Sequence, residues 1–297
     1  MKKISYVLTI LVEVTIVYAQ GSSTGSSYLL LPYHARPAAL AQAVVADAGT
    51  FSSIFINPAA IGMGNATELL LSHTEWIQDV RMETLGTRLP FDFGTLGLAV
   101  TTSSVEGIHF RERPGLPEAS FTARFSTLQA TYAYSLFDDL WIGAGAKYIH
   151  EKIFVDEATG YALDFGLIYS TPIEGLNAGV AFTNIGEMSA FRLSNAELPT
   201  SVQAGTSYTW ELEEFAFTAA ANIRNVARQE EMGLHLALEG RYRRFASLRI
   251  GYQSSSDVRS LSGGIGLSYH FLNLDYAYVP FLLRLGDGHI LSLRFLL

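Results

Sequence analysis

Residues 160–170 read GYALDFGLIYS, and their side chains alternate between two chemical classes. The odd positions, from Tyr161 to Tyr169, are apolar or aromatic, whereas the even positions are mostly small and include Asp164. Because successive side chains of a β-strand point to opposite faces, this alternation predicts a strand between two different environments. Aromatic residues at both ends of the apolar face are typical of a strand that crosses a membrane, where such rings lie at the headgroups.

The same alternation returns along the chain after residue 67 and predicts about fourteen strands, each of roughly nine to eleven residues, the length that crosses a bilayer at a tilt. We therefore expect an all-β protein, a transmembrane antiparallel β-barrel over residues 68–297. The predicted strands begin near Leu69, Val80, Gly94, Thr122, Leu140, Gly160, Leu176, Ser201, Phe215, Gly233, Ser247, Arg259, Leu272 and Ile290.

Charged side chains within the strands are expected to face the lumen, since a lysine or arginine on the lipid face costs about 2–4 kcal/mol at the midplane. The candidate lumen-facing polar residues are His73, Glu75, Asp164, Glu239 and Arg241. His73 and Glu75 lie two apart on one strand and could hold a metal or form an acid/base pair. No third ligand stands at a suitable spacing, so an inward-facing polar pair is the preferred interpretation.

The predicted connections differ at the two ends of the barrel. Those after even-numbered strands are short, such as FDD (137–139), whereas most of those after odd-numbered strands are longer, such as NIGEMSAFRLSNAELPT (184–200). Outer-membrane barrels have short periplasmic turns and longer external loops, so the longer set is expected outside. One external loop carries Phe281, Leu282 and Leu283. This apolar run either contacts a partner or folds back onto the barrel rim.

Composition narrows the range of functions. The chain of 297 residues has a formal charge of −8, no cysteine and 16% charged residues. A nucleic-acid partner is not expected because it would require a basic patch. No apolar run of 18 residues follows the first twenty, which argues against membrane helices. The sequence also has no nucleophile elbow and no phosphate-binding loop, so we expect no catalytic residues, no bound cofactor and no metal.

The N-terminal part does not alternate. Residues 1–19 combine Lys2 and Lys3 with an apolar segment and Ala19, which predicts a secretory signal peptide; a buried first helix is the alternative. Residues 20–67 contain an alanine-rich, helix-prone stretch and are expected to form a plug-like or hatch-like segment at or in the lumen, with a periplasmic tail as the alternative. Its Asn57-Pro58-Ala59 motif is interpreted as a tight turn capped by the asparagine, in preference to a ligand contact.

Several motifs together resemble the PorV/PorQ family, a branch of the FadL-like outer-membrane barrels. They are ARPAAL (35–40), the Asn57-Pro58-Ala59 motif, SHTEW (72–76), YIHEKI (148–153) and TNIG (183–186). The resemblance implies a fourteen-stranded barrel with its N-terminal segment near or inside the lumen. Two departures from the family pattern are the residues 41–43, where glycines are usual, and Leu296 and Leu297 after the closing aromatic residue.

The resemblance also implies a role. PorV and PorQ serve type IX secretion by moving or attaching exported proteins at the cell surface, whereas FadL carries hydrophobic molecules inward. We therefore expect a protein of the bacterial outer membrane that contacts outer-membrane lipid and binds exported or surface proteins. The alternative is a FadL-like channel with a hydrophobic ligand.

Overall fold

The computed structural model describes residues 26–47, 49–111, 113, 115, 117–191, 194–195, 197–227, 232–254 and 258–297. The predicted signal peptide over residues 1–19 lies outside the described residues. No helix in the described part of the chain is long and apolar enough to cross a membrane.

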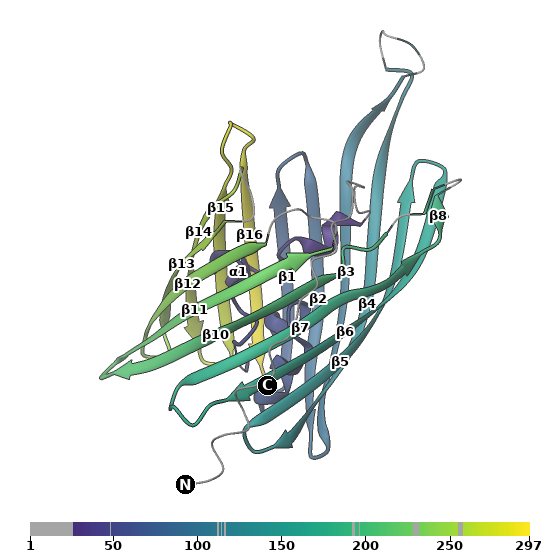
Figure 1. Cartoon of the computed structure of the whole chain (residues 1–297). Coiled ribbons are helices and arrows are strands. Elements are labelled where there is room, and N and C mark those ends of the chain that lie inside the picture. The colour runs from purple at the N-terminus through teal and green to yellow at the C-terminus, as the bar shows by residue number, and fades with distance from the viewer. Residues whose placement is uncertain are drawn as a thin grey trace.

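Among the described residues, fourteen antiparallel strands form a closed barrel, as expected (Figure 1). They are β1 (Glu68–Trp76), β2 (Val80–Phe91), β3 (Gly94–Phe110), β4 (Ala119–Phe137), β5 (Leu140–Ile153), β6 (Asp156–Ser170), β7 (Leu176–Met188), β10 (Ser201–Leu212), β11 (Phe215–Val226), β12 (Gly233–Tyr242), β13 (Ala246–Gln253), β14 (Leu261–Tyr269), β15 (Leu272–Pro280) and β16 (Asp287–Leu296). A small separate hairpin, β8 (Ala190–Phe191) and β9 (Ser194–Asn195), lies between β7 and β10.

The first and last strands close the barrel. They pair in antiparallel register from Glu68 opposite Leu296 to Glu75 opposite His289. The final residue continues this seam, because the Leu297 N–H donates to the Thr67 carbonyl at 2.9 Å. The two terminal leucines therefore belong to the closing strand pair and its edge.

The two faces of each strand meet different surroundings, as the alternation predicts. On β6, Leu163 and Phe165 are 47% and 45% exposed on the outer face, whereas Asp164 between them is fully buried. On β12, Leu236 is exposed and Glu239 is buried in the same way. The apolar side chains thus form an outer band for lipid, and the polar side chains fill the interior.

The external region of β3 and β4 differs from the prediction. Predicted strands of roughly nine to eleven residues that begin near Gly94 and Thr122 leave a long connection between them, but much of that stretch continues the two strands into a hairpin that rises above the rim (Figure 1). The register shifts between Val105 and Ile108, and Gly107 there has a φ of 69°. This β-bulge breaks the period-two alternation, which is why the sequence pattern stops before the strand does.

The N-terminal segment forms four short helices: η1 (Ser27–Leu30), α1 (Ala35–Ala39), η2 (Phe51–Phe55) and η3 (Pro58–Met63). The helix-prone alanine-rich stretch yields only the five residues of α1. Ala41 and Gln42 follow with φ values of 47° and 60°, in the left-handed region that ends a right-handed helix. The family resemblance implied glycines here, and the sharp bend forms without them.

Candidate functional site: the filled lumen

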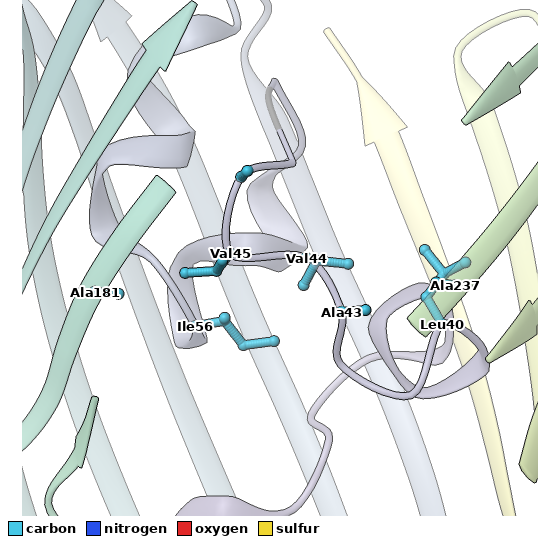
Figure 2. Close-up of a cluster of buried hydrophobic side chains, with 8 residues drawn as sticks. Leu40, Ala43, Val44, Val45, Ile56, Ala181 and Ala237 are labelled. Carbon is cyan, nitrogen blue, oxygen red and sulfur yellow. The ribbon is translucent and has the colours of Figure 1, made fainter. Parts of the chain in front are cut away.

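The lumen is occupied by the N-terminal segment, which we call the plug segment (described residues 26–47 and 49–67). Figure 2 shows one of its apolar contacts with the wall, where Val44 and Val45 are fully buried. Their cluster includes Ala181 of β7 and Ala237 of β12. Small wall side chains leave room for the larger side chains of the plug segment, so the two surfaces pack without a channel between them at this point.

Other apolar clusters attach the plug segment to the rest of the wall. Phe51, Ile54 and Ile61 pack with Leu70 of β1 and Ala99 of β3. Tyr28 and Leu29 pack with side chains of β5 and β6, and α1 packs with side chains of β15 and β16. The plug segment therefore contacts strands on several sides of the barrel.

The Asn57-Pro58-Ala59 motif caps η3 and holds two parts of the plug segment together. The Asn57 side chain accepts from the Ala59 N–H at 3.0 Å and donates to the Val45 carbonyl at 2.7 Å. Gly143 of β5 and Gly166 of β6 lie opposite each other in the sheet beneath this motif. A β-carbon at Gly166 would approach the Asn57 amide oxygen to 1.9 Å, so the close approach requires glycine there.

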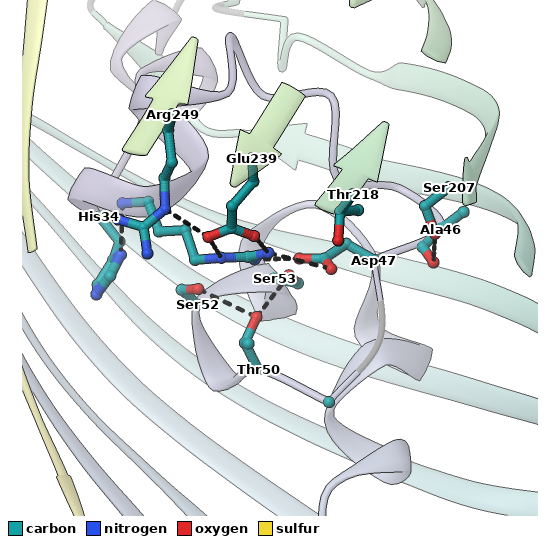
Figure 3. A network of polar contacts seen from close by, with 12 residues as sticks. His34, Ala46, Asp47, Thr50, Ser52, Ser53, Ser207, Thr218, Glu239 and Arg249 are labelled. Carbon is teal, nitrogen blue, oxygen red and sulfur yellow. Dashed lines mark hydrogen bonds and ion pairs between the residues drawn. The ribbon is translucent and has the colours of Figure 1, made fainter. Parts of the chain in front are cut away.

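A ladder of alternating charges joins the plug segment to the wall (Figure 3). Arg36 of α1 forms ion pairs with Asp47 of the plug segment and with Glu239 of β12, the latter at 2.6 Å. Glu239 in turn accepts from Arg249 of β13 at 2.6 Å. The ladder continues through neighbouring strands, and its members in order are Asp47, Arg36, Glu239, Arg249, Asp275, Arg294, Glu68 and Arg88.

The ladder is electrically balanced, with four arginines and four carboxylates. Buried charges are tolerated only when they are paired, and removal of one partner leaves an uncompensated charge. Glu239 is the member that connects the arginine of the plug segment to an arginine of the wall. It therefore links the position of the plug segment to the integrity of the barrel interior.

A second buried network seals an irregularity in the wall. The register between β6 and β7 shifts near Asp164, where Asn184 has a φ of 59°. The Asp164 carboxylate accepts from the Asn184 backbone N–H at 2.8 Å and pairs with Lys147 at 2.8 Å. Lys147 also donates to the Asn184 side chain at 2.7 Å. Side chains thus close the wall at the bulge.

The structure places the predicted lumen residues in different positions. Asp164 and Glu239 lie in the interior, in the two networks above. Arg241 has the same parity as Glu239 but is exposed near the end of β12, away from the ladder. The sequence did not indicate Arg36 as the partner of Glu239, because the segment that carries Arg36 does not alternate. Its only signal is a lone arginine within an apolar run.

The prediction for His73 and Glu75 is wrong, because both side chains point outward. They are 45% and 61% exposed, whereas Ser72 and Thr74 face the interior. The Ser72 hydroxyl contacts the Ser292 hydroxyl at 2.7 Å, so small polar residues take the inner positions of β1. His73 pairs with Glu83 on the neighbouring strand at 2.6 Å. Glu83 thus gives the outward-facing His73 a polar partner on the outer face of the barrel.

The apolar external loop is divided between the two interpretations. Phe281 packs edge-on against Trp76, with 5.3 Å between ring centroids, so its ring folds back onto the rim. Leu282 and Leu283 remain 54% and 78% exposed. Among the described residues, no group of three histidine, aspartate or glutamate side chains is arranged to hold a metal ion.

Comparison with known proteins shows which family this chain belongs to. The family model for type IX secretion system membrane proteins of the PorP/SprF type matches residues 42–287. The chain belongs to the PorP/SprF family. The expected connection with type IX secretion is thereby confirmed at the level of the family, but the match gives no support for the PorV/PorQ branch in particular. No curated protein matches the sequence.

Solved structures show the same fold for this PorP/SprF protein. The Pseudomonas putida toluene transporter TodX is similar with a TM-score of 0.54 and 10% identity, over 85% of this chain and 94% of that one. The monoaromatic hydrocarbon channel CymD is similar with a TM-score of 0.56 and 13% identity, over 86% and 95%. At these identities the likeness shows the FadL-like barrel fold alone. The family and the fold place the protein in the bacterial outer membrane.

The spaces in and around this PorP/SprF barrel differ in size. Three cavities between the plug segment and the wall each measure about 10 to 20 Å³. Such a volume holds about one water molecule. A larger depression of about 450 Å³ lies on the outer face of β16, β1, β2 and β3, where four leucines and Val100 line it together with polar residues that include His73 and Glu83. The roomier space is therefore on the lipid side of the wall.

Proposed function

We propose that this PorP/SprF protein is a non-enzymatic component of type IX secretion that holds exported or surface proteins at the outer face of the membrane. The observation that carries the proposal is the plug segment, which is attached to the wall by the ion pairs of the ladder; three cavities beside it, within the described residues, are each of about the size of a water molecule. A barrel filled in this way is suited to presenting a rigid outer surface, since its interior offers no wide path.

The outer surface supports this role through the raised hairpin of β3 and β4. Phe110 and Phe121 of the hairpin lie 5.7 and 5.2 Å from Phe154 of the next turn, measured between ring centroids. Phe110 and Phe154 remain 36% and 44% exposed. Exposed aromatic side chains above a membrane rim are typical of surfaces that contact proteins.

The test is deletion of the gene in its native bacterium, followed by quantification of the secreted and surface-attached proteins. We expect specific proteins to disappear from the surface and to return when the wild-type gene is restored. A variant with Phe110→Ser and Phe154→Ser should restore the barrel to the membrane but not the surface proteins. An unchanged secreted and surface proteome after deletion would contradict the proposal.

A FadL-like channel for hydrophobic molecules is the second candidate, supported by the fold shared with TodX and CymD and by the outer depression, whose lining includes four leucines and Val100. Such transport would require the plug segment to move, because the cavities beside it are too small for a hydrocarbon ring. Uptake of radiolabelled toluene by cells with and without the gene tests this function. Equal uptake would exclude toluene as its substrate.

A further inference from the structure

Among the described residues, two arginines at the outer mouth of the barrel have no carboxylate partner. Arg36, Arg88, Arg249, Arg294 and Lys147 each pair with an acidic side chain in the interior. Arg224 and Arg259 instead contact neutral groups, and neither forms a salt bridge within the described part of the chain. This difference singles them out among the interior cations.

Both arginines donate to neutral oxygen atoms. The Arg224 Nε donates to the Ser201 hydroxyl at 3.3 Å, and its Nη1 donates to the Gln42 side chain at 3.2 Å. The Arg259 Nη2 donates to the Gln253 side chain at 3.2 Å. These contacts use only part of the five N–H groups that each guanidinium offers. Neutral oxygens also leave the positive charge uncompensated.

The two arginines flank the same part of the plug segment. Gln42 and Pro32 line both of the cavities concerned, one of about 20 Å³ with Arg224 and one of about 10 Å³ with Arg259. Arg224 lies two residues before the outer end of β11, and Arg259 lies in the connection between β13 and β14. Both therefore lie on the side of the longer connections, where a solute from outside would arrive.

Arg259 is held in place and remains charged. Its guanidinium lies 5.3 Å from the centroid of the Trp76 ring and 5.9 Å from that of Phe281. Burial lowers the pKa of Arg259 to about 10, so it is protonated at neutral pH. Aromatic rings orient a cation but carry no net charge, so among the described residues the charge of Arg259 is not neutralised by an anion.

We propose that Arg224 and Arg259, on either side of Gln42, bind a small carboxylate group that enters from outside and rests against the plug segment. The planar guanidinium fork matches the two oxygens of a carboxylate. Each of the two cavities holds about one water molecule, so a carboxylate group would replace the water beside each guanidinium, and a hydrocarbon chain would not fit. The source of the carboxylate is either a free small acid or the end of a polypeptide. The site does not depend on the proposed role in secretion.

The test uses the full chain purified in detergent and follows its unfolding temperature. Sodium acetate and sodium formate are compared with sodium gluconate, a bulky carboxylate, at equal ionic strength. We expect the unfolding temperature to rise to a plateau with acetate and formate but not with gluconate. The rise should be lost in Arg224→Gln and in Arg259→Gln. It should persist in Arg241→Gln, which removes the same charge from an exposed position near the other end of the barrel.

Two peptide probes distinguish a free small acid from the end of a polypeptide as the source of the carboxylate. Triglycine with a free C-terminus is compared with amidated triglycine, in which the carboxylate is absent. Binding of acetate and tighter binding of the free peptide identify a polypeptide end, whereas binding of acetate without the free peptide identifies a free acid. If a glutamine variant fails to fold, Arg224→Lys keeps the charge but loses the fork, and acetate affinity should fall about tenfold. Absence of a saturable shift with every probe, or equal shifts in wild type and both glutamine variants, would overturn the proposal.

Discussion

Glu239→Gln should loosen the plug segment from the wall of the barrel. The substitution keeps the shape of the side chain and removes its charge. Glu239 accepts from Arg36 of the plug segment and from Arg249 of the wall, both at 2.6 Å. The change therefore weakens the connection between the two parts at one point while leaving the apolar contacts unaltered.

The expected free-energy cost of Glu239→Gln follows from the burial of these ion pairs. Removing one partner of a buried ion pair costs about 3–5 kcal/mol. We take the lower end, about 3 kcal/mol, because Arg36 keeps Asp47 and Arg249 keeps Asp275. Since each 1.4 kcal/mol is about a factor of ten, the ratio of docked to undocked plug segment should fall by more than about a hundredfold.

Planar-bilayer conductance and urea unfolding in lipid vesicles measure this effect. Wild type should be silent, and Glu239→Gln should show transient openings together with a lower free energy of unfolding. Glu174→Gln is the matched control, because it removes the same charge from an exposed turn. In a double-mutant cycle, Arg36→Met should cost much less in the Glu239→Gln background than in wild type. Unaltered conductance and stability in Glu239→Gln would refute the reasoning.

Three further changes test other parts of the structure. Gly166→Ala should destabilise the folded barrel in urea titrations by at least 1–3 kcal/mol, since its β-carbon would meet Asn57, whereas Gly263→Ala, which has only ordinary contacts, should cost less. Ala41→Gly should raise stability by about 1 kcal/mol in the same titrations, because a residue with a φ of 47° is strained unless it is glycine; an unchanged or lower midpoint would contradict this. Leu163→Arg should cost about 2–4 kcal/mol of refolding free energy in vesicles if that side chain faces lipid, and no loss would place it elsewhere.

The strands of the barrel could be predicted because their two faces meet different surroundings. Leu163 lies on the outer face and Asp164 in the interior, so the alternation of apolar and polar residues in the sequence predicts the strand and its two faces. The alternation fails where a bulge inserts extra residues, as beside Gly107 in β3. The assignment of charged residues to the lumen failed for His73, whose outward-facing side chain pairs with Glu83 on the neighbouring strand.

The filling of the lumen could be predicted only in outline. The apolar composition of the plug segment suggested that it would not lie free in water. Its fastening could not be predicted, because Arg36 and Glu239 are 203 positions apart in the chain and only the folded barrel brings them together. The bend at Ala41 was equally hidden, since the sequence there favours a helix and tertiary contacts override that preference.

A disulfide between the plug segment and the wall tests the central claim most directly. The chain has no cysteine, so an introduced pair has no competitor. A β-carbon at position 62 would lie 3.1 Å from that of Ala133, a little closer than the roughly 3.5–4.5 Å of a disulfide, so a shift of a few tenths of an ångström brings the pair into range. With Gly62→Cys and Ala133→Cys, oxidation of intact outer membranes should give a linked peptide pair by mass spectrometry. Gly62→Cys with Tyr134→Cys, the next residue and outward-facing, should give none. Absence of the first link, or equal yields of both, would contradict a plug segment seated in the lumen.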